Sequence, residues 1–180
     1  VIAWDAPAYG KSVERVASLE EYTVAFIEFL DALSITNVNL LGHSMGGVVA
    51  QGVAGFHPAR VTKLILSSTF MGHGAVESSP LGQGYLARLE DIKNMSPSEF
   101  GHARASSMVA PSASSETCKE VASIAAEVTC SGLLAGCKML HHADTRGLTA
   151  NFKIPVLVLT GEHDRVVVPA RSEEMAGLIY

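Results

Sequence analysis

The sequence predicts an α/β fold in which helices cover both faces of a mostly parallel sheet, with an all-helical segment inserted into the chain. Short apolar runs bounded by turn residues alternate with segments of helical periodicity, a pattern typical of parallel strands joined by helices. Between residues 69 and 151 the strand-like runs stop, and helical patterns rich in Ser and Ala replace them. We therefore expect a core built from residues 1–68 and 152–180, with a helical cap at 69–151.

Composition narrows the class of protein further. The 180 residues are 48% hydrophobic and 17% charged, as in an ordinary globular domain. The net charge of −5 would repel a phosphate backbone, which argues against a nucleic-acid partner. No apolar run reaches the roughly 20 residues that a membrane-spanning helix needs, so we expect no membrane association. The three cysteines form no C-x-x-C pair, which favours free thiols and a reducing, cytoplasmic location.

The first elements follow from local patterns. Val1–Trp4 is a short apolar run stopped by turn residues, which predicts a buried strand entering a loop. Ser18 and Glu21 have the spacing of a capping box, so a helix should begin there and bury an apolar stripe up to Leu33.

A second strand, Val38–Leu41, runs into a glycine-rich turn, after which Val48–Phe56 is apolar on all sides, as in a helix buried against a sheet. His57-Pro58 stops that helix, and Val61–Leu66 reads as a third strand.

The cap and the last core elements complete the pattern. Ser96-Pro97-Ser98-Glu99 is a helix start with an N-cap Ser, a Pro at the first position and a Glu at the third. Further cap helices are expected at Ser115–Val128 and Gly132–His142. Ile154–Thr160 is then a fourth strand with Pro near its start, and Pro169–Ile179 a final helix.

The segment Gly42-His43-Ser44-Met45-Gly46 carries the strongest chemical signal. A G-x-S-x-G motif between a strand and a helix is typical of a nucleophile elbow, whose sharp turn brings backbones so close that we expect only glycine to fit at Gly42 and Gly46. The following helix would aim free backbone N–H groups at the site, so the Met45 N–H could stabilise an oxyanion. The alternative is a structural glycine turn, which the flanking strand and helix disfavour.

A nucleophilic serine needs a base that a third group orients. Asp164 follows directly after the fourth strand, at the sheet edge where Ser44 should also lie, and is therefore the candidate acid. Glu162 is the weaker alternative. The alternative for Asp164 is an exposed loop carboxylate paired with Arg165. Ser68 and Thr69, after the third strand, offer no carboxylate.

Three motifs in this order resemble the α/β-hydrolase superfamily. Asp5–Ser12 is similar to its D-x-P-G-x-G-x-S loop, Leu41–Gly47 to its elbow, and Ile154–Asp164 to its segment carrying the triad acid. Ala8 stands where the family pattern has Gly, which would strain the loop if φ is positive there.

By this resemblance Ser44 is the nucleophile, Asp164 the acid, Met45 an oxyanion donor, and the helical insertion a lid. A serine at the elbow argues against the branches that use an Asp nucleophile. The cap looks most like that of 3-oxoadipate enol-lactonases, so the resemblance implies a hydrolase of a small ester or lactone that forms an acyl-enzyme. It implies no cofactor and no metal. Carbon–carbon bond hydrolases that act on meta-cleavage products and cofactor-free haloperoxidases are the alternatives within the fold, and a hydrolase-fold ligand receptor is the non-enzymatic alternative.

The family's base histidine follows the acid in the chain, and its His-Gly oxyanion loop precedes the equivalent of Val1; neither is found here. We therefore expect a fragment that is inactive alone and has unpaired, apolar strand edges that favour self-association, including a homo-oligomer. His43 is expected to pack and His163 to be a loop residue. His73 or His102 would have to act as the base if the chain alone hydrolyses esters.

His141, His142 and Asp144 lie close together in the sequence and raise the question of a metal site. Adjacent helical residues point about 100° apart and do not converge on one ion. We therefore interpret this group as a solvated helix end.

Overall fold

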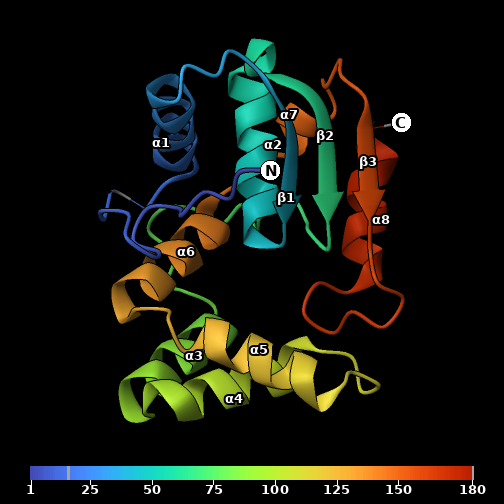
Figure 1. The fold of residues 1–180 in the computed structure, drawn as a ribbon. Coiled ribbons are helices and arrows are strands. Elements are labelled where there is room, and N and C mark those ends of the chain that lie inside the picture. The colour runs from blue at the N-terminus through green and yellow to red at the C-terminus, as the bar shows by residue number, and fades with distance from the viewer. Residues whose placement is uncertain (16, 180) are drawn as a thin grey trace.

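The computed structural model describes residues 1–15 and 17–179 and contains a parallel sheet. The strands are β1 (Val38–His43), β2 (Val61–Ser67) and β3 (Val156–Leu159), in the order β1-β2-β3. Figure 1 shows this sheet beside α1 and α2, with the helical insertion below it. The predicted parallel α/β fold with an inserted helical segment is confirmed, and these strands begin and end within two residues of the predicted ones.

Three helices and one short turn complete the core around the sheet. α1 (Leu19–Ala32) begins at Ser18, whose hydroxyl accepts a hydrogen bond from the Glu21 N–H. α2 (Met45–Phe56) is apolar on all sides and ends before a 3₁₀ turn at Pro58–Arg60. α8 (Pro169–Ile179) begins and ends where the sequence predicts.

The core lies between α2 and one face of the sheet. Val48 and Val53 of α2 are fully buried, as are Leu64 and Leu66 of β2 and Met175 of α8. Burial of such side chains removes apolar surface from water, at about 1.5–3 kcal/mol for each large side chain. This contact fixes the direction in which α2 leaves β1, and so fixes the position of the turn between them.

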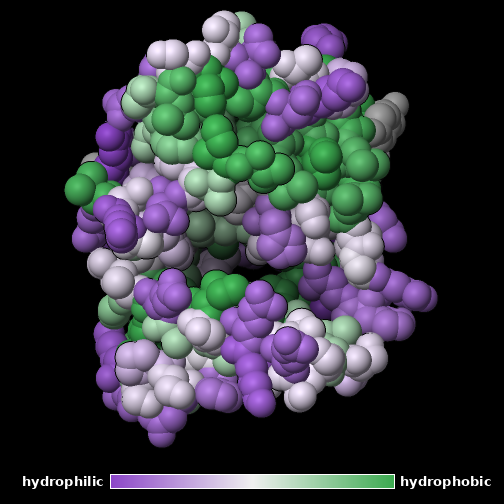
Figure 2. Space-filling model, viewed as in Figure 1, coloured by the Kyte–Doolittle hydropathy of each residue, from purple (hydrophilic) through white to green (hydrophobic). Residues whose placement is uncertain are grey.

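The other face of the sheet carries no helix within the described residues. Side chains alternate along a strand, and those that point away from α2 are exposed at Leu41 in β1, Lys63 in β2, and Leu157 and Leu159 in β3. Figure 2 shows the resulting apolar surface over the strands. The prediction placed helices on both faces; in the part of the chain that the structure describes, they cover one.

We expect Leu157→Lys to reduce self-association of the 180-residue chain. The Leu157 side chain is 50% exposed on the open sheet face, so a charge there interrupts the apolar surface without removing a core contact. Light scattering over a concentration series measures the effect, with Gln83→Lys, an exposed change on the cap, as the matched control. Equal mass distributions for the wild type and both variants would contradict it.

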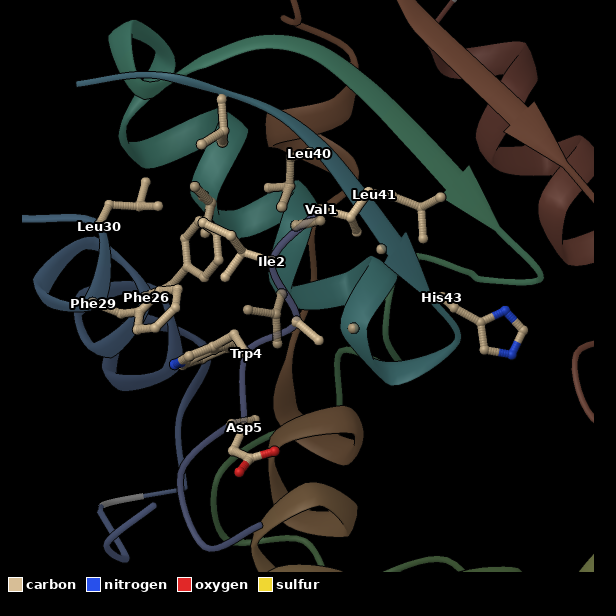
Figure 3. A pocket seen from close by; sticks show the side chains of 18 of the residues that line it. Val1, Ile2, Trp4, Asp5, Phe26, Phe29, Leu30, Leu40, Leu41 and His43 are labelled. Carbon is tan, nitrogen blue, oxygen red and sulfur yellow. The ribbon is translucent and has the colours of Figure 1, made fainter. Parts of the chain in front are cut away.

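The prediction of a buried strand at Val1–Trp4 is wrong. The segment is extended but pairs with no strand, and Val1, Ile2 and Ala3 are exposed. Only Trp4 is anchored, through ring contacts with two phenylalanines of α1. Residues 1–5 and β1 instead line the same groove of about 950 Å³ (Figure 3).

The insertion between β2 and β3 contains helices joined by loops, and no strand among the described residues. Its helices are α3 (Gln83–Asn94), α4 (Pro97–Met108), α5 (Ser115–Ala125) and α6 (Cys130–His142), followed by the short α7 (Arg146–Thr149). The predicted capping box at Ser96 and Glu99 is present in both directions. α6 begins two residues before the predicted start. Among the described residues no single helix is long and apolar enough to cross a membrane; α5 and α6 reach that length only together and are bent by 94°.

The chain enters and leaves the cap through one neck. Four backbone hydrogen bonds of 2.9–3.1 Å join the entering segment, residues 71–75, to the leaving segment, residues 140–145. They run from the His73 N–H to the Leu140 oxygen, Gly74 to Ala143, Ala75 to His141, and Thr145 to Met71. The two connections between core and cap are therefore held side by side.

The loop after Trp4 is where α6 docks on the core. Gly132 of α6 approaches the Ala8 carbonyl so closely that a β-carbon would lie 2.5 Å from its oxygen. Ala8 itself has φ of 67°, in the left-handed region that favours glycine, so the strain anticipated at this departure from the family pattern is present.

Replacing Ala8 by glycine should therefore raise the free energy of unfolding by about 1 kcal/mol, because glycine adopts this conformation without a Cβ clash. Ala6→Gly, in the same loop but without positive φ, should lower it by about 0.5–1 kcal/mol through chain entropy alone. Chemical denaturation of both variants measures the difference. A loss of stability in Ala8→Gly would show that the loop is not strained.

Candidate active site

Ser44 lies at the tight turn between β1, which ends at His43, and α2, which begins at Met45. Its backbone has φ of 50° and ψ of −119°, a conformation that non-glycine residues rarely adopt. The Ser44 N–H donates to the Ser67 carbonyl at 2.9 Å, which ties the turn to the neighbouring strand. This is the geometry expected of an elbow that raises the serine side chain above the sheet edge.

The glycines around Ser44 have different roles. A β-carbon on Gly42 would lie 2.5 Å from the Gly46 carbonyl oxygen, so β1 and α2 can approach here only because residue 42 is glycine. Gly46 has no atom within 4 Å of the equivalent position, so the expectation that crowding requires glycine there is wrong. The crowded residue on the helical side is Gly47, whose β-carbon would lie 2.4 Å from the Thr69 hydroxyl oxygen.

The backbone N–H of Met45 is the first of α2. No hydrogen bond within the described residues uses it, so it is free to bind an oxygen in front of the helix. The Met45 sulfur lies on the other side, where it accepts a hydrogen bond from the Tyr9 hydroxyl at 3.8 Å. A free N–H at a helix start, with the positive end of the helix dipole, is suited to stabilising negative charge.

Asp164 lies in the loop after β3, at the same sheet edge as Ser44. Its Oδ1 accepts two hydrogen bonds of 2.9 Å, from the N–H groups of Val166 and Val167. These bonds fix the carboxylate and leave Oδ2 outside the hydrogen bonds of the described residues. Arg165 does not pair with Asp164; it donates to the Val109 carbonyl at 3.3 Å and links the acid loop to the cap.

Ser44 and Asp164 line one hollow of about 440 Å³. The core contributes the ends of its strands and the acid loop, including Glu162, and the cap contributes residues 107–110. The hollow thus lies where an open parallel sheet gathers functional side chains, at the carboxyl ends of its strands. The sequence placed Ser44 and Asp164 together at this edge, and the structure brings them into one site.

Two of the histidines line this hollow. His43 contacts the Ser67 hydroxyl at 3.3 Å, and His163 adjoins the acid. The two histidines considered as bases from the cap lie elsewhere. His73 is at the neck, in ring contact with Phe70 and Tyr85, and His102 on α4 is bonded to its own helix.

The adjacent histidines at the end of α6 are hydrogen-bonded to separate partners. His141 contacts the Ser79 hydroxyl and His142 the Ala75 carbonyl, so their ring nitrogens do not face one point. Burial raises the pKa of the Cys137 thiol, which favours the unreactive neutral form.

Sequence reasoning passed over Thr69 because it offers no carboxylate. Its side chain is fully buried beneath the elbow and donates to the Ser44 carbonyl at 2.7 Å. No sequence motif marks such a residue; only the crowding of Gly47 against it, visible in the fold, points to it.

Comparison with known proteins places these features in context. A family model described as Serine aminopeptidase, S33 (Hydrolase_4) matches residues 1–179. The chain is 26% identical over 178 residues to 3-oxoadipate enol-lactonase 2 of Acinetobacter baylyi, covering 96% of this chain and 64% of that protein.

Two solved structures share the fold. One is an enol-lactonase from Burkholderia xenovorans, with a TM-score of 0.82, 21% identity, and coverage of 96% of this chain and 66% of that one. The other is an esterase from Exiguobacterium antarcticum, with a TM-score of 0.82, 23% identity, and coverage of 97% and 67%. The chain therefore spans about two thirds of the length of these relatives.

Proposed function

Because the chain belongs to the α/β-hydrolase family described as Serine aminopeptidase, S33, we propose that the protein is a serine hydrolase that cleaves a small ester or lactone through an acyl-enzyme. The observation that carries this proposal is Ser44 in a positive-φ turn, facing a hollow that it shares with the Asp164 carboxylate. The likeness to enol-lactonases and an esterase supports the same reaction class.

In the proposed reaction the Ser44 hydroxyl oxygen attacks the acyl carbonyl, and its proton passes to an imidazole base. The free Oδ2 of Asp164 is placed to accept the other N–H of that base and so to hold its tautomer. The carbonyl oxygen becomes an oxyanion that the Met45 N–H binds. The base returns the proton to the leaving alkoxide, and a water molecule then hydrolyses the acyl-enzyme by the same steps.

The size and lining of the hollow favour a substrate with a small, largely apolar acyl group. Its volume of about 440 Å³ is near the lower end for ligand pockets. Apolar side chains contribute from both the cap and the acid loop, namely Met108, Val109, Ala110, Val166 and Val167. A short acyl chain or a small lactone ring fits such a lining better than a long or highly charged substrate.

Labelling with a fluorophosphonate tests the assignment directly, because the reagent reacts only with an activated serine. In the full-length protein we expect one adduct, mapped by mass spectrometry to the peptide carrying Ser44, together with turnover of p-nitrophenyl acetate. Ser68→Ala, a matched serine in the same hollow, should leave both unchanged. An adduct at a different residue would reassign the nucleophile, whereas ligand binding without adduct or turnover would favour the receptor.

A further inference from the structure

A buried polar network lies directly beneath the elbow. Thr69, Gln51 and Thr145 are fully buried, and Ser172 is 1% exposed, yet every one of their side chains is hydrogen-bonded. Buried polar groups that are fully satisfied hold their neighbours rigidly, because breaking one bond leaves another group unpaired in an apolar environment. The network connects the elbow to the exit of β2, to α7 and to α8.

Thr69 is the member that touches the nucleophile's own backbone. Its hydroxyl donates to the Ser44 carbonyl at 2.7 Å, and its carbonyl accepts from the Ser172 hydroxyl at 2.8 Å. Thr69 is thus anchored to α8 on one side while it holds Ser44 on the other. The absence of a side chain at Gly47 gives the Thr69 hydroxyl the space to reach this position.

The Ser44 carbonyl and the Met45 N–H belong to the same peptide group. This peptide is trans, as are all peptide bonds of the described residues, so the two groups lie in one plane and point in opposite directions. A hydrogen bond that fixes the direction of the carbonyl therefore fixes the direction of the N–H. The Gly47 N–H donates to the same carbonyl at 2.9 Å, and Thr69 adds a second restraint from outside α2 on a turn whose φ and ψ lie outside the common energy minima.

We propose that Thr69 is a positioning residue that aims the Met45 N–H at the oxyanion by holding the opposite end of their shared peptide plane. The proposal rests on the proposed role of Ser44 as nucleophile. Gln51 supports the same arrangement from behind: its amide donates to the Gly47 and Phe70 carbonyls at 3.0 and 2.9 Å, and its oxygen accepts from Thr145 at 2.6 Å. The first turn of α2 and the segment carrying Thr69 are thereby joined into one unit.

Thr69→Val tests the proposal, because valine keeps the shape and removes the donor. Thr69→Ser keeps the hydroxyl and serves as the conservative rescue. Thr149→Val is the matched control: Thr149 is also fully buried, but its hydroxyl bonds to the Arg146 carbonyl at 3.1 Å and the Met71 sulfur at 3.7 Å, away from the elbow. Thr69→Ala replaces the valine variant if the latter does not fold.

Two readouts are compared across these variants of the full-length protein. The first is fluorophosphonate labelling of Ser44, separated into its maximal rate and half-saturating concentration. We expect Thr69→Val to lower the maximal rate about 10- to 100-fold, with the half-saturating concentration changed less than about threefold, since a misaimed oxyanion donor affects the transition state and not initial binding. The maximal labelling rate of Thr69→Ser should lie within about threefold of the wild-type rate, and that of Thr149→Val should equal the wild-type rate.

The second readout is the amide resonance of Met45 in the nuclear magnetic resonance spectrum without any ligand. It should shift in Thr69→Val and stay in place in Thr149→Val. The proposal would be overturned if Thr69→Val left the Met45 resonance or the labelling rate unchanged. It would also be overturned if both valine variants lost labelling rate equally, or if Thr69→Ser did not restore that rate. A wild-type protein that shows no labelling at Ser44 would instead refute the proposed function, and the Met45 resonance would still decide the role of Thr69.

Discussion

In the full-length protein, replacing Ser44 by alanine is expected to abolish ester turnover, with a loss in kcat on the order of 10⁶-fold, the scale found for serine nucleophiles in triads. The covalent step needs the hydroxyl, and no neighbouring side chain occupies the same position at the turn. Stability should barely change, because the Ser44 side chain makes none of the hydrogen bonds of the described residues. Steady-state kinetics with p-nitrophenyl acetate, beside thermal unfolding, separates the two effects.

Asp164→Asn provides the companion measurement. The amide oxygen can still accept the two loop N–H groups, but the charge that orients the base is gone, so we expect a loss of about 10⁴-fold. Ser68→Ala in the same hollow controls for general disturbance of the site. A Ser44→Ala protein that keeps a substantial part of its activity would show that hydrolysis follows another route.

A second large effect is expected from Gly42→Ala. The new β-carbon would meet the Gly46 carbonyl oxygen at 2.5 Å, the Gly47 α-carbon at 2.6 Å and the Ala50 β-carbon at 2.7 Å. Two of these atoms are backbone, so β1 and α2 must move apart and the core beneath them must open. We expect a loss of about 3 kcal/mol in the free energy of unfolding, at the upper end for overpacking, and loss of the elbow geometry.

Gly46→Ala is the matched control for that variant, four residues along the same motif. Its β-carbon meets nothing within 4 Å, and alanine favours a helix over glycine by about 1 kcal/mol, so stability should hold or rise. Urea denaturation of both variants, with fluorophosphonate labelling, measures fold and site together. Equal stability of the two variants would contradict the close approach of β1 and α2.

The parts of the fold that sequence predicts well are those with local causes. α8 was predicted from the proline at its start, Pro169. α2 was predicted because the segment after the glycine turn is apolar on all sides. The elbow was predicted for the same reason, since its glycines and its flanking elements are contiguous in the chain. Ser44 and Asp164 could be placed at one edge because parallel strands align their carboxyl ends.

What the sequence could not show depends on contacts between distant segments. An apolar run such as Val1–Trp4 looks like a strand whether or not it pairs with a partner, and here it pairs with none among the described residues. The cover on a sheet face is likewise set by packing, not by the strand's own pattern. Which glycine of the elbow region is crowded depends on Thr69, which lies 22 residues beyond Gly47 in the chain.

The neck that joins core and cap has a consequence for how this architecture changes over time. Because backbone hydrogen bonds clamp residues 71–75 to residues 140–145, the core meets the insertion as a closed loop with fixed ends. The entropic cost of such a loop grows only by about 0.6 kcal/mol for each doubling of its length. A cap of different size or sequence can therefore be inserted between the same two ends while the elbow keeps its geometry. The cap and the core that carries Ser44 can therefore vary separately.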